Sequence, residues 1–513
     1  MKLDFAKNTK RNIIARLSNN GVDSAIRFFR KTIFMWVLGS EYLGLNGLFY
    51  AILGILSLAE LGFGYAVVSH MYKLVATDDH KLFCAYLRFY RGVYRYVGSF
   101  IFIAGLCLLP FLRHLIHGNV PPDVNLHIVY VMFLVNSAIG YFFFAYRGSI
   151  LHAYHSTYIM TYIGIFSSIV EFVVLCLVLY LTHNYYYYLI VVIARTIFEN
   201  LIVYKATRIY FPDIIPEGDL PQEEKKRIRN DITAIIFHKI GEVVNCYSDN
   251  LVISAFIGLT AIGAFGNYMH ITTALEGIVM SLCFSMSGGF GNKIHTESRE
   301  ANFELFMKAH RMLMCFIIWC AAMQLALFQP FMILWIRNRP ELLCHFLTPL
   351  LLVIWFFERK SRDSLVMFKT AAAIWQKDKW KSIVANIANL TMNITFVLTF
   401  PDEYKLDGVI FSTIISDVLI QVPWESYAVF TSFFGGKEAR YYWRRQAMYV
   451  LLGIFVCGVT WYVAYLIPVV GFVGFFLKGV AAFVISILLL LVSCRDDALL
   501  VLGRFRPHAK VER

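Results

Sequence analysis

The apolar residues of this chain come in runs of about 20, the length that a helix needs to cross a hydrocarbon core of about 30 Å. Lipid offers no partner to unpaired backbone groups, so such runs must fold as helices or as barrel strands. The runs lack the strict apolar–polar alternation of barrel strands, which favours helices. The composition, 58% hydrophobic and 16% charged, provides too little polar surface for a soluble fold. The sequence therefore predicts an all-α polytopic membrane protein.

We expect about fourteen spanning helices. Their predicted ranges are 18–38, 43–71, 96–112, 128–146, 157–181, 187–204, 232–258, 263–291, 312–336, 343–374, 382–400, 406–432, 447–467 and 473–494. Most of the 47 Lys and Arg residues lie in the two tails and in one alternating set of loops. The opposite loops hold only Arg113, Arg337, Arg339 and Lys405. Because basic loops stay in the cytoplasm, both termini are predicted to be cytoplasmic, in a cytoplasmic membrane.

The formal charge of +13 is thus explained by topology, and its dispersal over short loops argues against a nucleic-acid partner. The ten cysteines form no CxxC pair and the fourteen histidines show no HExxH spacing. We therefore expect no disulfide framework, no metal site and no cofactor.

A weak internal repeat divides the chain. Residues 38–44 read LGSEYLG and residues 257–263 read IGLTAIG, at an offset of 219 residues, and each follows an apolar helix. Two six-helix units that start on the same side form a parallel repeat, with a cavity between the two lobes. The predicted organisation is an N-terminal lobe at 1–204, a cytoplasmic linker at 205–231, a C-terminal lobe at 232–432, and two further helices with a tail at 433–513.

Several cations lie inside predicted spans, where a charge is costly and normally faces a partner or a wet cavity. In the first helix Arg27, Arg30 and Lys31 share one face, and Asp23 is a candidate partner of Arg27. The alternative is a cluster that snorkels to the cytoplasmic surface.

The span 343–374 carries a charged block made of Glu358, Arg359, Lys360, Arg362 and Asp363. Spacing allows Glu358 to pair with Arg362 and Arg359 with Asp363. We expect one long, bent helix with a charged stretch that faces the cavity; the alternative is that the helix ends near Phe357.

Lys239 is a further cation near the start of the seventh span, where an interfacial role is equally consistent with the sequence. A basic cavity between two lobes would suit an anionic ligand, and phosphate matches Arg forks and Lys charges.

A second group of polar residues could bind or relay a cation. Asp249 lies within a span, and Asn386, Asn389 and Asn393 share one face of the span 382–400. Carboxylate and amide oxygens suit Na⁺, and a carboxylate can also relay H⁺. From spacing alone, polar contacts between helices are the favoured interpretation.

Residues 42–64, YLGLNGLFYAILGILSLAELGFG, resemble the N-terminal signature of bacterial polysaccharide flippases of the O-antigen and capsule type, in the MOP exporter superfamily. SDNLVIS at 248–254 and GLTAIGAFGNY at 258–268 resemble the start of their second lobe. LDGVIFSTIISD at 406–417 resembles their twelfth-helix region.

This resemblance implies a transporter, not an enzyme, that moves undecaprenyl-diphosphate-linked oligosaccharides from the inner to the outer leaflet by alternating access. It makes Arg27 and Arg30 candidate diphosphate contacts, with Lys31, Lys239, Arg359, Lys360 and Arg362 as further substrate-binding candidates. It also makes Asp249, Asn389 and Asn393 candidate ligands for a coupling Na⁺ or H⁺. Expected partners are membrane lipids, a polysaccharide polymerase and glycosyltransferases.

Two other functions compete with this one. A multidrug exporter of the same superfamily would need a more acidic or aromatic cavity, and the cations of the first helix argue against it. A membrane glycosyltransferase or polymerase would need catalytic groups on a sizeable outer loop. The longest predicted outer loop, 113–127, holds a single acidic residue, Asp123.

Overall fold

The computed structural model describes residues 5–493 apart from 61–62, 118–119, 295, 337–338, 373, 375–376 and 378–379. For some helical residues, including 230–246, it describes the backbone alone. The part of the chain that is described contains helices and loops but no strand. The chain divides into two compact units, Met1–Gly263 and Ala264–Arg513, called here unit 1 and unit 2. The predicted all-α membrane fold is confirmed.

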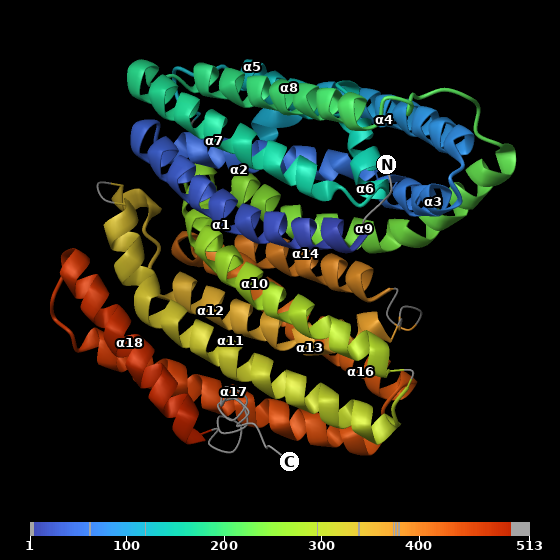
Figure 1. The fold of residues 1–513 in the computed structure, drawn as a ribbon. Helices are drawn as coiled ribbons and strands as arrows, with labels where there is room; N and C mark the ends of the chain where they lie inside the picture. The colour runs from blue at the N-terminus through green and yellow to red at the C-terminus, as the bar shows by residue number, and fades with distance from the viewer. Residues whose placement is uncertain are drawn as a thin grey trace, which may run out of the picture. The chain divides into compact units, whose positions relative to one another are not determined.

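Unit 1 is a bundle of nine α-helices with short 3₁₀ turns among the residues described (Figure 1). Its elements are α1 Phe5–Val37, α2 Ser40–Leu56, η1 Ser57–Glu60, α3 Phe63–Thr77, α4 His80–Leu108, η2 Leu109–Leu115, α5 Leu126–Phe142, η3 Ala145–Arg147, α6 Gly148–Ala153, α7 Thr157–Thr182, α8 Tyr185–Tyr210 and α9 Gln222–Phe256. Helix α1 packs along α7, and α7 packs along α8.

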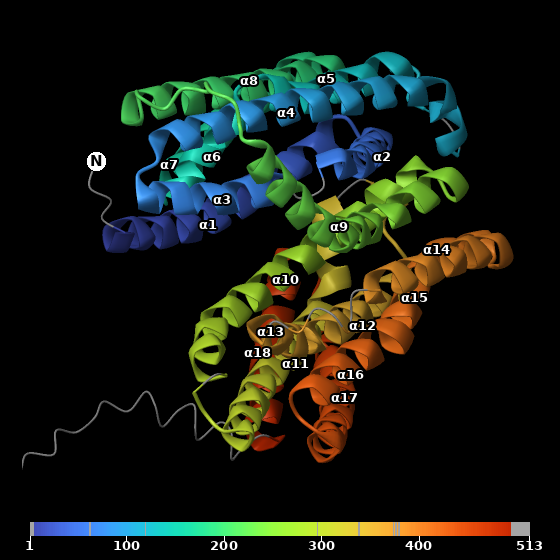
Figure 2. The same cartoon turned by 90° about the vertical axis from the view of Figure 1, so that its right-hand side faces the viewer.

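Unit 2 contains the helices from α10 onward. The first residues of α10 still belong to unit 1, which ends at Gly263. Its elements are α10 Leu259–Lys293, α11 Arg299–Ile336, η4 Pro340–Leu342, α12 Leu347–Ser361, α13 Asp363–Ala371, α14 Lys381–Thr399, η6 Asp402–Tyr404, α15 Lys405–Ser416, the π-helical turn η7 Asp417–Gln421, α16 Val422–Ser432, α17 Gly436–Tyr465 and α18 Gly471–Ser493. Figure 2 shows α14 beside α15, and α16 continuing the direction of α15.

Polar side chains cap several helices at the ends of loops. The Asp79 carboxylate accepts a hydrogen bond from the backbone N–H of Leu82 at the start of α4. Asn125 and Asn184 cap α5 and α8 in the same way. These caps satisfy backbone donors that the first turn of a helix leaves unpaired, and they fix where each helix begins.

Two glycines with positive φ lie at corresponding positions of the predicted repeat. Gly39 separates α1 from α2 with φ 114°, and Gly258 separates α9 from α10 with φ 126°. A side chain is strained at such angles, so glycine suits both positions. The two residues are 219 positions apart, which is the offset of the sequence repeat. The predicted lobe boundaries themselves stay a prediction.

The predicted span 43–71 is not one uninterrupted helix. Helix α2 ends at Leu56, a 3₁₀ turn covers Ser57–Glu60, and α3 begins at Phe63. The physical reason is the carboxylate of Glu60, which accepts hydrogen bonds from the Tyr94 and Tyr141 hydroxyls. A polar anchor of this kind interrupts the apolar helix that composition alone predicts.

By length and composition, eight helices of the described chain can cross a membrane, or nine if α5 and the segment Ala145–Ala153, bent by 43°, form one span. Helices also occupy the other predicted spans, among them the shorter apolar helix α2. The protein is thus a multi-pass membrane protein, and the count of fourteen stays a prediction.

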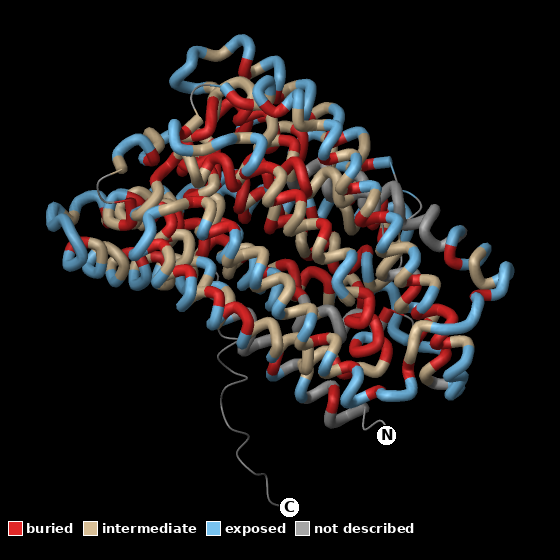
Figure 3. Tube along the Cα trace, turned by 90° about the horizontal axis from the view of Figure 1, so that it is seen from above, coloured by how far each residue is buried: buried red, intermediate tan, exposed pale blue. Residues whose placement is uncertain are grey.

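Buried residues gather within each bundle, and exposed residues lie on the outer sides of its helices (Figure 3). In unit 1 the core between α3, α4, α6 and α9 includes Met71, Tyr86, Ile150 and Ile228. Large apolar side chains are nevertheless exposed along outer faces, for example Leu177 on α7 and Phe476 on α18. An apolar exterior of this kind suits contact with lipid.

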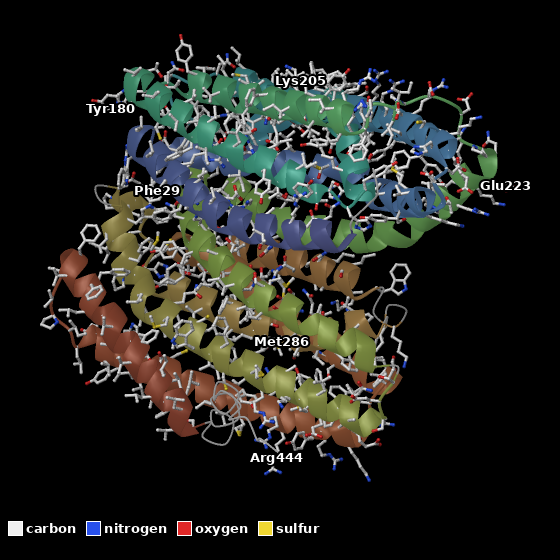
Figure 4. The ribbon with its side chains drawn as sticks, in the orientation of Figure 1. Phe29, Tyr180, Lys205, Glu223, Met286 and Arg444 are labelled. Atoms are coloured by element: carbon white, nitrogen blue, oxygen red, sulfur yellow. The ribbon has the colours of Figure 1, made fainter. Side chains whose placement is uncertain are left out.

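The two ends of unit 1 carry different kinds of side chain at the labelled positions, an aromatic ring at one end and a carboxylate at the other. Figure 4 labels Tyr180, near the last turn of α7, and Glu223, at the start of α9, at opposite ends of the unit. The charge bias places Tyr180 at the outer interface and Glu223 in the cytoplasm, and this sidedness stays a prediction.

Candidate functional site

The first candidate site is a row of four charged side chains in unit 1, called here the Arg30 cluster: Arg30 on α1, Glu171 on α7, and Arg195 and Glu199 on α8. Nη1 of Arg30 donates to Oε1 and Oε2 of Glu171 at 3.3 and 3.2 Å. Nε of Arg195 lies 3.6 Å from Oε2 of Glu171, and its Nη2 lies 3.0 Å from Oε2 of Glu199. Glu171 therefore holds two guanidinium groups together.

The Arg30 cluster includes residues near the middle of two long helices, of which α7 is long and apolar enough to cross a membrane. Glu171 is near the middle of the 26-residue helix α7, and Arg195 is near the middle of the 26-residue helix α8. The side chain of Glu171 is only 1% exposed, whereas those of Arg30 and Arg195 are 29% and 31% exposed. Ionisable groups in the middle of a spanning helix are costly and normally serve a substrate, an ion or each other.

The other two cations of the first predicted span have different surroundings. Arg27 pairs with Asp23 at 3.1 Å, as its spacing predicts, and its side chain is 53% exposed. Lys31 is partly buried. Near this part of α1 the sequence predicted three cations against one carboxylate. The structure adds one cation and two carboxylates, Arg195, Glu171 and Glu199.

A second cluster, in unit 2, surrounds Arg362 at the junction of α12 and α13. Nη1 of Arg362 donates to Oε1 of Gln421 at 2.9 Å. The guanidinium also lies 3.4 Å from Glu358, 3.7 Å from Asp417 and 3.7 Å from Glu425. The helix continues past Phe357 into this charged block and is divided at Arg362 into α12 and α13, so it does not end near Phe357. That the charged stretch faces a cavity stays a prediction.

Buried carboxylates from separate elements thus meet at one arginine. Glu358 belongs to α12, Asp417 to the π turn η7 and Glu425 to α16, and Lys381 of α14 also pairs with Glu425. π turns often occur at functional positions. We call Glu358, Arg362, Asp417, Gln421, Glu425 and Lys381 the Arg362 cluster.

The remaining charges of the block form pairs near α10. Arg359 lies 3.4 Å from Glu276, and Lys360 lies 3.6 Å from Glu276 and 3.1 Å from Asp363. The predicted pair of Arg359 with Asp363 is therefore replaced, because Asp363 takes Lys360 at i−3. The role of Arg359, Lys360 and Arg362 in substrate binding stays a prediction.

The asparagines of α14 form a hydrogen-bonded row against α15. Nδ2 of Asn389 donates to Oγ1 of Thr413 at 3.0 Å, and Nδ2 of Asn393 donates to Oδ1 of Asn389 at 3.2 Å. Oδ1 of Asn393 accepts from Ser412. Both asparagines are buried, as is Asn386. The geometry is that of polar contacts between two membrane helices.

The other predicted site residues lie on α9. Asp249 is partly buried in unit 1, whereas Asn389 and Asn393 belong to unit 2. Their common ion site stays a prediction. The side chain of Lys239 lies outside the described residues.

Sequence reasoning missed Glu171, Arg195 and Glu199. The signal was present, because all three are ionisable residues inside the predicted spans 157–181 and 187–204. What the sequence lacks is any spacing that connects Glu171 with Arg30, 141 residues away. It also missed Asp417 and Glu425, which reach Arg362 from a different helix.

No protein-family model and no curated protein matches the sequence. Solved structures do match it. Lipid II flippase MurJ in an inward closed conformation aligns with a TM-score of 0.68 at 15% identity, over 94% of this chain and 98% of that one. An inward-facing multidrug resistance MATE family transporter of the MOP superfamily aligns with a TM-score of 0.62 at 14% identity, over 82% and 99%.

The Vibrio cholerae MATE transporter VcmN aligns with a TM-score of 0.54 at 14% identity, over 84% of this chain and 99% of that one. At these identities the likeness concerns the fold. The chain has the fold of MOP superfamily transporters, and the match covers 82–94% of this chain and 98–99% of each transporter.

Proposed function

We propose that this protein is a flippase that moves an undecaprenyl-diphosphate-linked oligosaccharide from the inner to the outer leaflet of a bacterial cytoplasmic membrane. The observation that carries the proposal is the Arg30 cluster, in which two partly exposed guanidinium groups meet at Glu171, near the middle of the apolar helix α7. Arg forks match the oxygens of a diphosphate in geometry and in charge.

The fold supports this choice of function. The likeness to lipid II flippase MurJ extends over 94% of the chain. A diphosphate and its sugars cannot cross hydrocarbon unaided, because charged and polar groups lose their hydration there. A basic, wet path through the protein would keep them solvated while the lipid tail stays in the bilayer. Transport of this kind is not an enzymatic reaction.

The proposal includes an ion that couples to transport, Na⁺ or H⁺, at Asp249 with Asn389 and Asn393. It also includes delivery of the substrate by glycosyltransferases and its use by a polymerase. Asp249→Asn should slow transport while the melting temperature stays close to that of the wild type. An equally active variant would remove Asp249 from the mechanism.

The competing function is export of drugs, and the MATE likeness is the observation in its favour. The partly exposed guanidinium groups of Arg30 and Arg195 argue against it, since they suit an anion better than a cationic drug.

The test is deletion of the gene in its host, followed by complementation with variants. Arg30→Gln should abolish surface polysaccharide and accumulate lipid-linked oligosaccharide, with the protein still present in the membrane. Arg88→Gln is the matched control, because Arg88 is half exposed and pairs with the exposed Asp219. Normal polysaccharide in the deletion strain, together with sensitivity to drugs, would support the exporter instead.

A further inference from the structure

Glu171 is the one buried member of the Arg30 cluster, and it separates two arginines that reach farther toward solvent or lipid. Its Oε2 atom lies 3.2 Å from Nη1 of Arg30 and 3.6 Å from Nε of Arg195. Two guanidinium groups that meet at one oxygen atom are close enough for one diphosphate to bridge them.

The contacts of these arginines are incomplete. Arg30 donates to both oxygens of Glu171 through Nη1 alone. Among the residues described, none accepts a hydrogen bond from its Nε or Nη2. Nη2 of Arg195 donates to Ser168 at 3.3 Å, and its buried Nε has no hydrogen-bond partner among the residues described. The contacts to Glu171, at 3.2 to 3.6 Å, are longer than the roughly 2.7–2.9 Å of strong charged hydrogen bonds.

Each arginine thus keeps donors that Glu171 does not use. A carboxylate that made the best permanent pair with Arg30 would take two parallel bonds from the guanidinium fork. Here both oxygens share a single nitrogen, so the fork remains available to another anion.

We propose that Glu171 is an exchangeable counter-ion, which pairs with Arg30 and Arg195 when the site is empty and yields both to the substrate diphosphate. Arg195 is then a second diphosphate contact beside Arg30. This inference rests on the proposed function and names two further residues for it.

The exchange has a use in transport. An empty site with two unpaired cations beside the middle of α7 would be costly, and Glu171 removes that cost. When a diphosphate takes the arginines, Glu171 becomes a buried carboxylate without its partners. Its return to Arg30 and Arg195 therefore favours release of the substrate, and it keeps binding from becoming too tight for turnover.

The neighbours of Glu171 fit this role. Glu199 stays with Arg195 on the same helix, so Arg195 keeps one carboxylate when it leaves Glu171. The phenol rings of Tyr50 on α2 and Tyr188 on α8 lie near Arg30 and Glu171. Glu171 is the carboxylate that both arginines share, so it is the one that a bridging diphosphate must displace.

The experiment measures binding of undecaprenyl diphosphate to the full-length protein in nanodiscs, together with flipping in reconstituted vesicles. Glu171→Gln removes the competitor but keeps the shape, so affinity should rise about tenfold while turnover falls. Arg195→Gln should lower affinity about tenfold, as Arg30→Gln should. Undecaprenyl monophosphate should bind the wild type more weakly than the diphosphate, because it offers fewer oxygens to the two guanidinium forks.

Glu224→Gln is the matched control, because Glu224 also pairs with an arginine, Arg227, but lies at the end of the unit where α9 begins. It should leave binding and flipping unchanged. Glu171→Asp keeps the charge with a shorter reach and should tighten binding less than Glu171→Gln, so the inference stays testable if the Gln variant does not fold.

Unchanged or weaker binding by a folded Glu171→Gln variant would overturn the exchange, and Glu171 would be a structural ion-pair partner. In that case wild-type binding of undecaprenyl diphosphate would leave the proposed function intact. A wild-type protein that binds no undecaprenyl diphosphate would overturn both.

Discussion

Arg27 and Arg30 are neighbours on one turn of α1, but only Arg30 reaches a buried carboxylate on another helix. Arg27 pairs with Asp23 of its own helix and is 53% exposed, whereas Arg30 pairs with Glu171 of α7 and is 29% exposed. The two predicted diphosphate contacts therefore differ in their surroundings.

This difference predicts unequal effects of the same substitution. Arg30→Gln should reduce transport by tenfold or more, since a charged hydrogen bond contributes about 1.5–3 kcal/mol. Arg27→Gln should cost less than threefold, because exposed ion pairs contribute about 0–1 kcal/mol. Flipping rates of reconstituted variants, normalised to protein amount, provide the measurement. Equal losses in both variants would mean that the two arginines act together at the substrate, as the sequence alone predicts.

Arg362 should matter for folding more than for transport. It is surrounded by the carboxylates of Glu358, Asp417 and Glu425, so its removal would leave buried negative charge without a partner. Arg362→Met should destabilise the protein by about 3–5 kcal/mol. Thermal unfolding in detergent measures this, with Arg444→Met on the exposed side of α17 as control. A stable Arg362→Met variant that fails to bind substrate would instead support the predicted binding role.

The charged clusters show what a single sequence can and cannot predict. Glu358 and Arg362 are four residues apart on one helix, and spacing alone predicts their ion pair. Asp417 and Glu425 reach the same arginine from α16 and its π turn, and no local spacing relates them to it. The same holds for Glu171 and Arg30. Contacts between different helices depend on how the helices pack, and residue spacing in one sequence does not predict that packing.

Helix boundaries show a similar division. The apolar runs predict α7 and α18 nearly to their ends, because lipid imposes both composition and length. The break between α2 and α3 lies near Glu60, an ionisable residue that the sequence does place inside the run 43–71. Its hydrogen bonds to tyrosines of other helices could not be predicted from that run.

Asn393 is expected to act mainly between helices. Its amide donates to Asn389 and its carbonyl accepts from Ser412, which joins α14 to α15. Asn393→Ala should lower the free energy of unfolding by about 1–3 kcal/mol, because buried partners lose their bonds. The loss should be the same in sodium and in choline buffer. A loss of stability seen only in sodium would favour the predicted ion site, and Thr395→Ala on the exposed side of α14 is the control.

The predicted orientation can be tested by labelling single cysteines in a background without the native ten. Cysteines at Lys225 and Arg444 should react with an impermeant reagent only after the cytoplasmic face is opened. A cysteine at Asp402 should react in intact cells, because the loop that contains it carries few basic residues. Reaction of all three from the same side would contradict the topology.

Gly44 tests the close packing at the beginning of α2. A Cβ atom added there would lie 2.1 Å from the carbonyl oxygen of Leu259 and 2.6 Å from its carbonyl carbon. These are backbone atoms, so no side-chain rotation relieves the contact and the helices themselves must shift. Gly44→Ala should therefore destabilise unit 1 by about 1–3 kcal/mol, despite the better helix propensity of alanine.

Gly140, in α5, is the matched control because an added Cβ would meet nothing within 4 Å. Gly140→Ala should leave stability unchanged or raise it by up to about 1 kcal/mol, which is the helix propensity difference alone. Thermal unfolding of both variants in the same detergent gives the comparison, and flipping rates show whether the packing also matters for transport. If Gly44→Ala proves as stable as Gly140→Ala, the contact between α2 and Leu259 is looser than 2.1 Å implies, and the two helices can separate there without cost.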